Sequence, residues 1–247
     1  MSEDLVTALA ATRGIICLVG AGGKKTTMYA LAQAHPGRVL LSSTSHMYEY
    51  DREQVDVALT LDNPNEPLPN FAQERVIAVA AVTDTPHRVG GLSPERIKSI
   101  YTTRQFDLCI VKADGARARW IKSPGSHEPL IPAFADTVIP VVSAQVIGRR
   151  LDDRIAHRPK RLTDLLGIEL GEPITPEHVS NLLSHPCGSL KGVGEATVIP
   201  LINMVDSPDI QEVAREVAIG ALERTNRISR IVLASMRDRR LVEVVER

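Results

Sequence analysis

The residues best suited to chemistry lie in a glycine-rich stretch near the amino end, CLVGAGGKKTT at Cys17–Thr27. Glycines let backbone N–H groups curve around phosphate oxygens, and a helix that follows adds the partial positive charge of its N-terminus. A lysine here neutralises the outer phosphates, and a neighbouring hydroxyl ordinarily holds Mg²⁺. We therefore predict a phosphate-binding loop. The residues predicted to bind the nucleotide in this loop are Gly20, Ala21, Gly22, Gly23, Lys24, Lys25, Thr26 and Thr27.

The spacing departs from the commonest phosphate loop, because Leu18 stands where a glycine is expected and Lys25 stands where a hydroxyl is expected. The shorter glycine arrangement resembles the loop of peptidoglycan-precursor ligases, in which Gly-Lys-Thr-Thr follows a glycine and two variable residues. An ammonium has no acceptor, so Lys25 cannot ligate a metal. We expect it either to face the phosphates or to point away along the helix, which leaves Thr26 as the candidate Mg²⁺ ligand. The alternative is a strand-to-helix turn without a ligand.

Asp114 ends the hydrophobic run DLCIVKAD. An acid at the carboxyl end of such a strand orients Mg²⁺ or water in nucleotide hydrolases, so we predict Asp114 and Lys24 as catalytic residues. A turn that begins at Asp-Gly is the alternative. The hydroxyl-rich segment Ser42–Tyr48 follows an earlier strand, and from it Thr44 joins Thr26 and Asp114 as a candidate metal ligand.

A late segment, LINMVD at Leu201–Asp206, carries Asn-x-x-Asp. Guanine-binding GTPases use Asn-Lys-x-Asp after a strand: the acid accepts hydrogen bonds from the base, and the asparagine braces the phosphate loop. We predict that Asn203 and Asp206 contact the base, although Met204 replaces the lysine. A loop after a strand, without a ligand, is the alternative.

A further charged segment, ADGARARWIKSPGSHEPLIP, spans residues 113–132. Long loops of this kind are usually functional, and the alternative is an ordinary surface loop. The residues that could meet an anion are Arg117, Arg119 and Lys122, and the acid–base candidates are His127 and Glu128.

Short β-branched runs alternate with helical patterns along the chain, which predicts an α/β fold with a mostly parallel sheet and helices on both faces, similar to P-loop NTPases. We expect one domain, residues 1–247, with a helical insertion near residues 149–195. Ligands of such sheets bind beyond the carboxyl ends of the strands. The expected strands are 14–20, 38–43, 55–61, 75–81, 107–114, 137–144, 196–204, 229–235 and 241–246, and the expected helices are 25–35, 93–103, 160–166, 176–184 and 209–224.

The composition limits the classes of partner. Of 247 residues, 43% are hydrophobic and only 3% aromatic, which suits a core of Val, Ile, Leu and Ala between strands and helices. A net charge of -1 gives no field that favours nucleic acid or an anionic membrane, and the basic run Arg149–Arg161 is interleaved with acids. Three widely spaced cysteines do not form a disulfide framework, and no apolar run is long enough to span a bilayer. We expect a cytoplasmic protein with no nucleic-acid or membrane partner.

Together these stretches resemble the YqeC family, described as accessory or cofactor-biosynthesis proteins of selenium-dependent molybdenum hydroxylases. The motifs that carry the resemblance are VGAGGK, ADGAR, HEPLIP, HRP, LKGV and the late Asn-x-x-Asp. The family has threonine after the loop lysine, an acid before ADGA and lysine in the late motif. This chain has Lys25, Lys112 and Met204 at those positions.

Two hypotheses of function follow. In the first, the protein is an NTPase-like accessory factor that binds ATP or GTP with Mg²⁺ and assists the maturation of a selenium- or molybdenum-dependent hydroxylase. In the second, it is a non-hydrolysing chaperone that binds a nucleotide or the molybdenum cofactor and docks on a client hydroxylase. Lys25 favours the second hypothesis because it removes the usual metal ligand.

Overall fold

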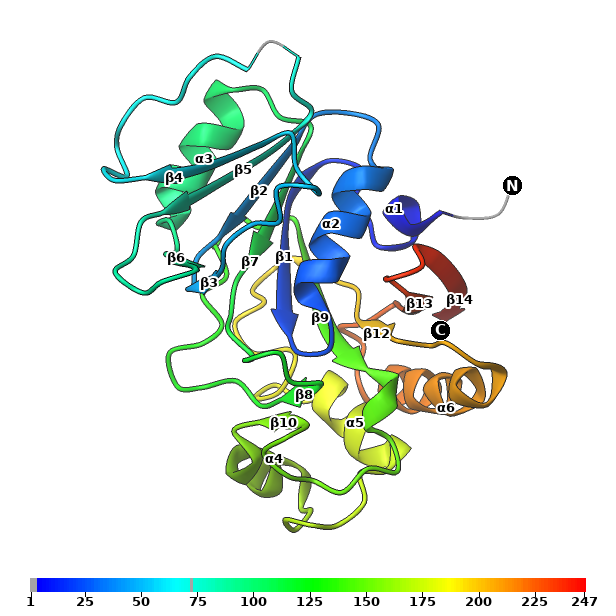
Figure 1. The fold of residues 1–247 in the computed structure, drawn as a ribbon. Coiled ribbons are helices and arrows are strands. Elements are labelled where there is room, and N and C mark those ends of the chain that lie inside the picture. Colours follow the sequence, from blue (N-terminus) through cyan, green and yellow to red (C-terminus); the bar gives the residue numbers. More distant parts are fainter. Residues whose placement is uncertain (1–3, 72) are drawn as a thin grey trace.

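A large sheet runs through the molecule and carries most of its core (Figure 1). The computed structural model describes residues 4–71 and 73–247. The strands of the large sheet are β1 (Gly14–Gly20), β2 (Val39–Ser43), β4 (Val57–Leu61), β5 (Val76–Ala81), β7 (Leu108–Lys112), β9 (Thr137–Ser143), β11 (Thr197–Val198), β12 (Leu201–Asn203), β13 (Arg230–Ser235) and β14 (Arg240–Glu246). Two small sheets pair β3 (Met47–Tyr48) with β6 (Arg88–Val89), and β8 (Ile121–Lys122) with β10 (Ala156–His157).

The strand order of the large sheet is β14-β13-β12-β9-β1-β7-β2-β5-β4, and β11 pairs with β9. All of its pairings are parallel except β13 with β14. The helices are α1 (Leu5–Ala8), α2 (Lys24–Ala34), α3 (Pro94–Thr103), α4 (Pro159–Leu166), α5 (Pro176–Ser184) and α6 (Pro208–Arg224). The α/β class, the mostly parallel sheet and a P-loop NTPase-like arrangement are thus confirmed.

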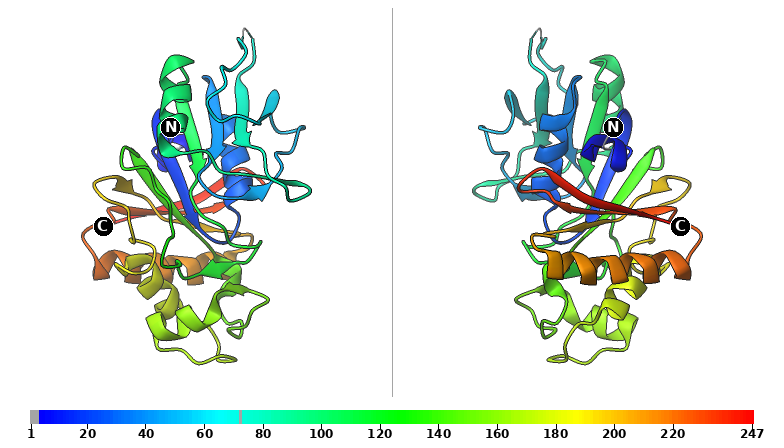
Figure 2. Two further views of the ribbon diagram at one scale, coloured as in Figure 1. Left: turned by 90° about the vertical axis from the view of Figure 1, so that its left-hand side faces the viewer. Right: turned by 90° about the vertical axis from the view of Figure 1, so that its right-hand side faces the viewer.

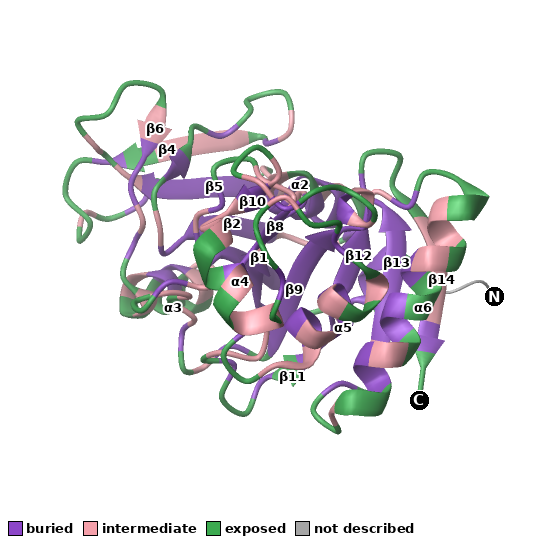
Figure 3. Ribbon diagram, turned by 90° about the horizontal axis from the view of Figure 1, so that it is seen from below, coloured by how far each residue is buried: buried purple, intermediate pink, exposed green. Residues whose placement is uncertain are grey.

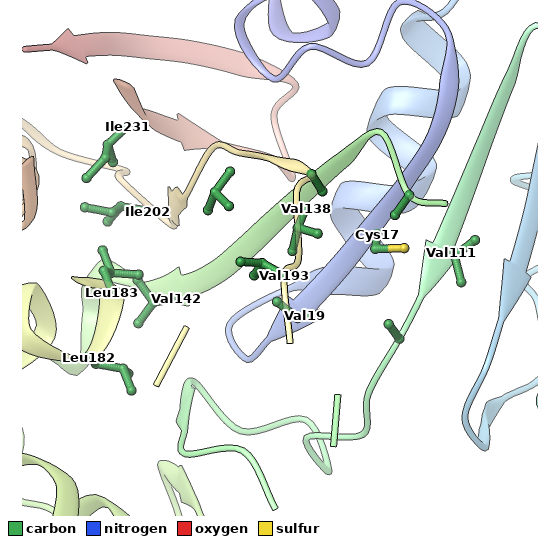
Figure 4. Packing of buried hydrophobic residues seen from close by; sticks show 14 of the residues in the cluster. Cys17, Val19, Val111, Val138, Val142, Leu182, Leu183, Val193, Ile202 and Ile231 are labelled. Carbon is green, nitrogen blue, oxygen red and sulfur yellow. The ribbon is translucent and has the colours of Figure 1, made fainter. Parts of the chain in front are cut away.

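Helices cover both faces of the sheet because successive side chains of its central strands point to opposite faces. In β1, Ile16 and Leu18 pack in a cluster with Met28 and Leu31 of α2. Ile15, Cys17 and Val19 pack in the cluster that includes side chains of α3, α5 and α6. Figure 4 shows Cys17 and Val19 in that second cluster, and Figure 3 shows the central strands of the large sheet, such as β1 and β9, as buried.

The two turned views show the strands lying between α2, in blue, and α6, in orange (Figure 2). The segment 149–195 contributes α4 and α5, and its side chains Leu162, Val179 and Leu182 belong to the same hydrophobic cluster as Cys17 of β1. The predicted division into a domain and an insertion stays a prediction. Among the described residues, no helix has the length and apolar character needed to cross a membrane.

One predicted strand is divided. The run 196–204 forms β11 and β12, with Pro200 between them. Proline has no N–H to donate to a neighbouring strand, although the Pro200 carbonyl still accepts a hydrogen bond from Val232. β11 and β12 both pair with β9, so the interruption does not displace the carboxyl end of β12 from the sheet.

Strand order brings the predicted site residues to one edge. β7 lies between β1 and β2, and its Lys112 is in register with Leu18 of β1 and with Ser43 of β2. On the other side of β1, β9 and β12 run in the same direction, and Asn203 of β12 pairs with Ser143 of β9. The carboxyl ends of these parallel strands therefore surround the glycine loop between β1 and α2.

Candidate functional site

The glycine loop is packed tightly against the neighbouring strand ends, which explains why it contains glycine. Gly22 and Gly23 have φ values of 96° and 116°, in the left-handed region that side chains disfavour. A Cβ atom on Gly22 would lie 2.4 Å from the backbone nitrogen of Ser143, and one on Gly23 would lie 2.3 Å from Nδ2 of Asn203. The loop thus has no room for side chains at these two positions.

Three amides of the loop already have protein partners. The N–H of Gly20 donates to Oδ2 of Asp114 at 3.0 Å, that of Ala21 to the Val141 carbonyl at 2.9 Å, and that of Gly22 to the Arg119 carbonyl at 2.9 Å. The next amides begin α2, whose first intrahelical bond runs from Thr27 to the Gly23 carbonyl. The N–H groups before it, at residues 24–26, have no intrahelical partner and are the backbone donors that an anion can use.

A buried ion cluster lies beside the loop. Nζ of Lys24 is 3.0 Å from Oδ1 of Asp114, and Nζ of Lys122 is 2.8 Å from Oδ2. The three residues are only 5%, 1% and 3% exposed, and Lys24 also donates to the Gly20 carbonyl. Burial lowers the pKa of Lys24, and the charge of Asp114 opposes that shift. The two predicted catalytic residues are therefore in contact, and Lys122 joins them.

Lys122 links this cluster to a second carboxylate. Its ammonium donates to the Gly115 carbonyl at 2.7 Å and to Oε2 of Glu128 at 2.9 Å, and Arg158 bonds to the same oxygen. Burial alone would raise the pKa of Glu128, but the hydrogen bonds from Arg158 and Lys122 lower it to about 2. Glu128 is thus a fixed negative charge rather than an acid–base group.

The neighbouring histidines do not supply acid–base chemistry to the cluster. Burial, together with the charges of Arg158 and Lys122, lowers the pKa of His157 to about 4, so its imidazole is neutral at pH 7. His127, the other acid–base candidate from the sequence, is exposed, as is Arg117. Arg119 is half-buried, and it is its backbone carbonyl that contacts the glycine loop.

Lys112, at the end of β7, adds a third buried ammonium. Its Nζ lies 2.9 Å from Oγ of Ser45 and 3.4 Å from the His46 carbonyl. Burial and the charges of Lys24 and Lys122 lower its pKa to about 7. Among residues 4–71 and 73–247, no carboxylate lies within ion-pair distance of this ammonium.

The cluster therefore carries more positive than negative charge. Its cations are Lys24, Lys112, Lys122 and Arg158, and its carboxylates are Asp114 and Glu128. A buried excess of cations is unfavourable unless an anion compensates it. The hollow beside Asp114 measures only about 10 Å³, and its lining includes Lys122, Pro124, Pro129, Gly188 and Ser189. An anion larger than water does not fit this hollow unless its lining residues move.

Lys25 faces a different part of the surface from Lys24. Its ammonium donates to the Glu49 carbonyl and lies 5.7 Å from the centre of the Tyr29 ring. Of the two alternatives for Lys25, the structure has the side chain pointing away from the ion cluster. It borders an open hollow of about 400 Å³ between α2 and the turn after β13. The residues lining this hollow, here called the α2 hollow, are Lys25, Thr26, Tyr29, Ala30, Asp51, Gln54, Met236, Arg237 and Arg239.

The candidate metal ligands are not gathered around one point. Thr26 is exposed and lines the α2 hollow, whereas Asp114 lies in the ion cluster. The hydroxyl of Thr44 donates to the Leu130 carbonyl at 2.8 Å, and that of Thr27 donates to the Gly23 carbonyl at 3.1 Å.

The expected binding of Mg²⁺ stays a prediction. The ion requires oxygen ligands in near-octahedral geometry. At Asp114 it would lie against the ammonium groups of Lys24 and Lys122. Among the residues that the structure describes, no group of three or more His, Cys, Asp or Glu side chains is placed to hold a metal.

The predicted base-binding residues lie on the other side of the glycine loop. Asn203 is buried; its Nδ2 donates to the Gly22 carbonyl at 2.8 Å, and its Oδ1 accepts from the Met236 N–H at 3.0 Å. Asp206 is exposed, and its Oδ1 accepts from the Ser235 hydroxyl at 2.8 Å. The structure thus places a bracing asparagine beside the loop and an accessible carboxylate three residues further along the chain.

Met204, between them, does not extend along a base. Its φ is 63°, and its sulfur accepts a hydrogen bond from the Ser143 hydroxyl at 3.0 Å. Gln145 donates to its carbonyl at 3.1 Å. Met204 therefore packs toward the end of β9 in place of the lysine that other proteins carry at this position.

Sequence reasoning missed part of this site. It named Lys122 only as one of several basic loop residues and Lys112 only as a departure from a family pattern, and it did not find Ser235. A lysine that ends an all-apolar strand, as in CIVK, is the signal that could have identified Lys112. No comparable signal marks Lys122, whose contact with Asp114 is formed only by the folding of the loop.

Comparison with known proteins relates this site to one family. A family model described as YqeC protein matches residues 16–160. A protein of Escherichia coli (strain K12) named "Uncharacterized protein YqeC" is 28% identical over 182 residues, which cover 72% of this chain and 71% of that protein. The matched range 16–160 contains the glycine loop and the ion cluster and ends before Asn203 and Asp206.

Proposed function

Since this chain belongs to the YqeC family, we propose that it is a nucleotide-binding protein whose glycine loop and ion cluster hold the phosphates of ATP or GTP. The observation that carries the proposal is Lys24, a nine-tenths buried lysine at the N-terminus of α2 that contacts a carboxylate at the end of the neighbouring strand β7. The free amides at residues 24–26 and the excess of buried cations both favour a multiply charged anion.

The groups predicted to contact the base favour a guanine nucleotide. A guanine base offers a ring N–H and an amino group, which an accessible carboxylate can accept together. Asp206 supplies such a carboxylate, held from behind by Ser235. The α2 hollow, about 400 Å³ in volume, borders the same turn after β13 and offers space for the nucleoside.

The structure favours binding over hydrolysis. Oδ2 of Asp114 is held by Lys122 and the Gly20 N–H, and Oδ1 lies 3.0 Å from Nζ of Lys24, so two ammonium groups compete with water or Mg²⁺ for the carboxylate. We therefore infer a non-hydrolysing factor whose docking on a client depends on the bound nucleotide. The client class, a selenium- or molybdenum-dependent hydroxylase or its cofactor, is part of the proposal and is supported by the family resemblance alone. An NTPase-like accessory factor is the second candidate, favoured by Oδ1 of Asp114, a buried carboxylate oxygen that accepts no hydrogen bond from the described residues and could therefore orient water or a metal.

A calorimetric titration of the full chain with GTP and ATP, followed by a phosphate-release assay, tests the proposal. Nucleotide binding, with no more phosphate release than the Lys24→Met variant shows, supports the non-hydrolysing docking factor. Release that depends on Lys24 supports the NTPase. Failure of both nucleotides to bind refutes the nucleotide function.

A further inference from the structure

A side chain of the protein itself supplies a positive charge to the carboxylate that was predicted to orient Mg²⁺. Nζ of Lys122 lies 2.8 Å from Oδ2 of Asp114, the carboxylate oxygen that also accepts the Gly20 N–H. The ammonium and the glycine loop thus meet on one oxygen. Lys122 is only 3% exposed and is further fixed by the Gly115 carbonyl and Glu128.

The hydroxyl groups that would complete a metal site have other neighbours in the structure. Lys25 stands at the usual hydroxyl position and faces the Glu49 carbonyl, and Thr26 lines the α2 hollow. The Thr27 and Thr44 hydroxyls donate to backbone carbonyls. A divalent cation at Asp114 would have few oxygen ligands and two adjacent ammonium groups.

The cluster carries positive charge of its own. Lys24, Lys112 and Lys122 are each more than nine-tenths buried, and they share the field of the single buried carboxylate of Asp114. Within the described part of the chain, Lys112 has no carboxylate at ion-pair distance. Burial lowers its pKa to about 7, so at neutral pH the side chain is only partly protonated, and an approaching anion would favour the charged form.

We propose that this site binds the phosphates of its ligand without a divalent metal, with the ammonium groups of Lys122 and Lys112 supplying the charge that Mg²⁺ provides in ordinary phosphate loops. The inference rests on the proposed nucleotide function and deepens it, because it identifies the bound species as the metal-free polyphosphate. Movement of the segment that carries Lys122 opens the cluster, and the phosphates then replace Asp114 as the partner of at least one ammonium.

The test is a calorimetric titration of the full chain with GTP, once in EDTA and once in excess Mg²⁺. For the wild type we expect the two dissociation constants to agree within about threefold, since the protein supplies the cationic charge. Lys122→Met should weaken binding in EDTA by roughly tenfold or more, the effect of one charge-assisted contact. Lys160→Met removes an exposed lysine outside the cluster and serves as the matched control, with affinity unchanged.

Lys112→Met is the second variant, in case Lys122→Met does not fold. It leaves no carboxylate of the described chain without its ion-pair partner, so it should fold, and we expect it too to weaken GTP binding in EDTA severalfold. Unfolding curves of each variant identify any that are not native. If neither folded variant weakens binding, the inference is refuted.

A titration with inorganic pyrophosphate in EDTA distinguishes failure of this inference from failure of the proposed nucleotide function. If the wild type binds GTP tenfold or more tightly with Mg²⁺ than without it, the metal-free site is refuted while the nucleotide function stands. If GTP does not bind under either condition, the nucleotide function fails. In that case, pyrophosphate binding that Lys122→Met or Lys112→Met weakens still supports a metal-free anion site, and absence of pyrophosphate binding refutes it.

Discussion

Asn203 donates a hydrogen bond from its side-chain nitrogen to the carbonyl oxygen of Gly22, 2.8 Å away, although 181 positions separate the two residues. Its side-chain oxygen accepts a hydrogen bond from the Met236 N–H. One buried side chain thus connects the glycine loop to the ends of β12 and β13. The predicted phosphate-binding and base-binding regions are held in a fixed relation by this contact.

Removing this connection should cost stability. In Asn203→Ala, the Gly22 carbonyl and the Met236 N–H lose their partner, and each unsatisfied buried group costs about 1–3 kcal/mol. We expect the free energy of unfolding in urea to fall by roughly 2–4 kcal/mol. The exposed Asn226→Ala variant is the control and should change it by less than about 0.5 kcal/mol. An equal, small change in both variants would show that the connection is not structural.

Asp206 should determine the choice of base without affecting the fold. It is exposed and is oriented by Ser235, so Asp206→Asn should leave the unfolding curve nearly unchanged. GTP affinity should fall roughly 10- to 150-fold, the effect of losing a charge-assisted contact, and preference should shift toward xanthosine triphosphate. Competition binding with GTP, ATP and xanthosine triphosphate measures this. Equal affinity of the wild type for GTP and ATP would reduce Asn203 and Asp206 to a structural loop.

Lys25 and Lys122 should together control the requirement for metal. Lys25→Thr restores a hydroxyl beside Lys24, but Asp114 remains held by two ammonium groups, so Mg²⁺ dependence of GTP binding should change by less than about threefold. The double variant Lys25→Thr/Lys122→Met removes the ammonium from Oδ2 of Asp114 and should bind GTP at least about tenfold more tightly with Mg²⁺ than without it. Titration of both variants with and without Mg²⁺ tests this. A wild type that already depends on Mg²⁺ as strongly as the double variant would make Thr26 or Thr27 the ligand.

Glu128 should make stability depend on pH in the acid range. Burial opposes ionisation, but hydrogen bonds from Arg158 and Lys122 lower its pKa from the ordinary 4.5 to about 2. Because the folded state favours the ionised form, this stabilisation is complete above about pH 4.5 and is lost as the pH falls to about 2.

Glu128→Gln should therefore lower the free energy of unfolding by about 2–3 kcal/mol at pH 7, with a difference that shrinks toward pH 2. Urea unfolding between pH 2 and pH 7, with the exposed Glu95→Gln as control, measures the effect. A difference from the wild type that is the same at every pH would contradict the ion-pair account.

The local structure was largely predictable from the sequence. β1 is an apolar run bounded by glycines, and the predicted start of α3 is confirmed, since the Ser93 side chain accepts the Arg96 N–H and Pro94 occupies the first turn. The site residues at the strand ends could be predicted because ligands of parallel sheets bind beyond the carboxyl ends of the strands.

Long-range relations were not predictable. Nothing in the sequence places β7 between β1 and β2, because strand pairing depends on the whole fold. Lys122 follows Asp114 by eight residues in a segment of turns, and its return to the carboxylate is a property of the folded loop. The direction of Lys25 depends on the Glu49 carbonyl and Tyr29, which periodicity cannot reveal.

The most direct test of the central claim is a calorimetric titration of GTP into the wild type, Lys24→Met and the control Lys160→Met. Lys24 is the buried cation at the start of α2, so its loss should weaken binding roughly 10- to 150-fold while the control binds as the wild type does. Unfolding curves must show that Lys24→Met is native. GTP affinity that is the same in Lys24→Met as in the wild type, or absent from the wild type, would contradict a phosphate-binding role for the glycine loop.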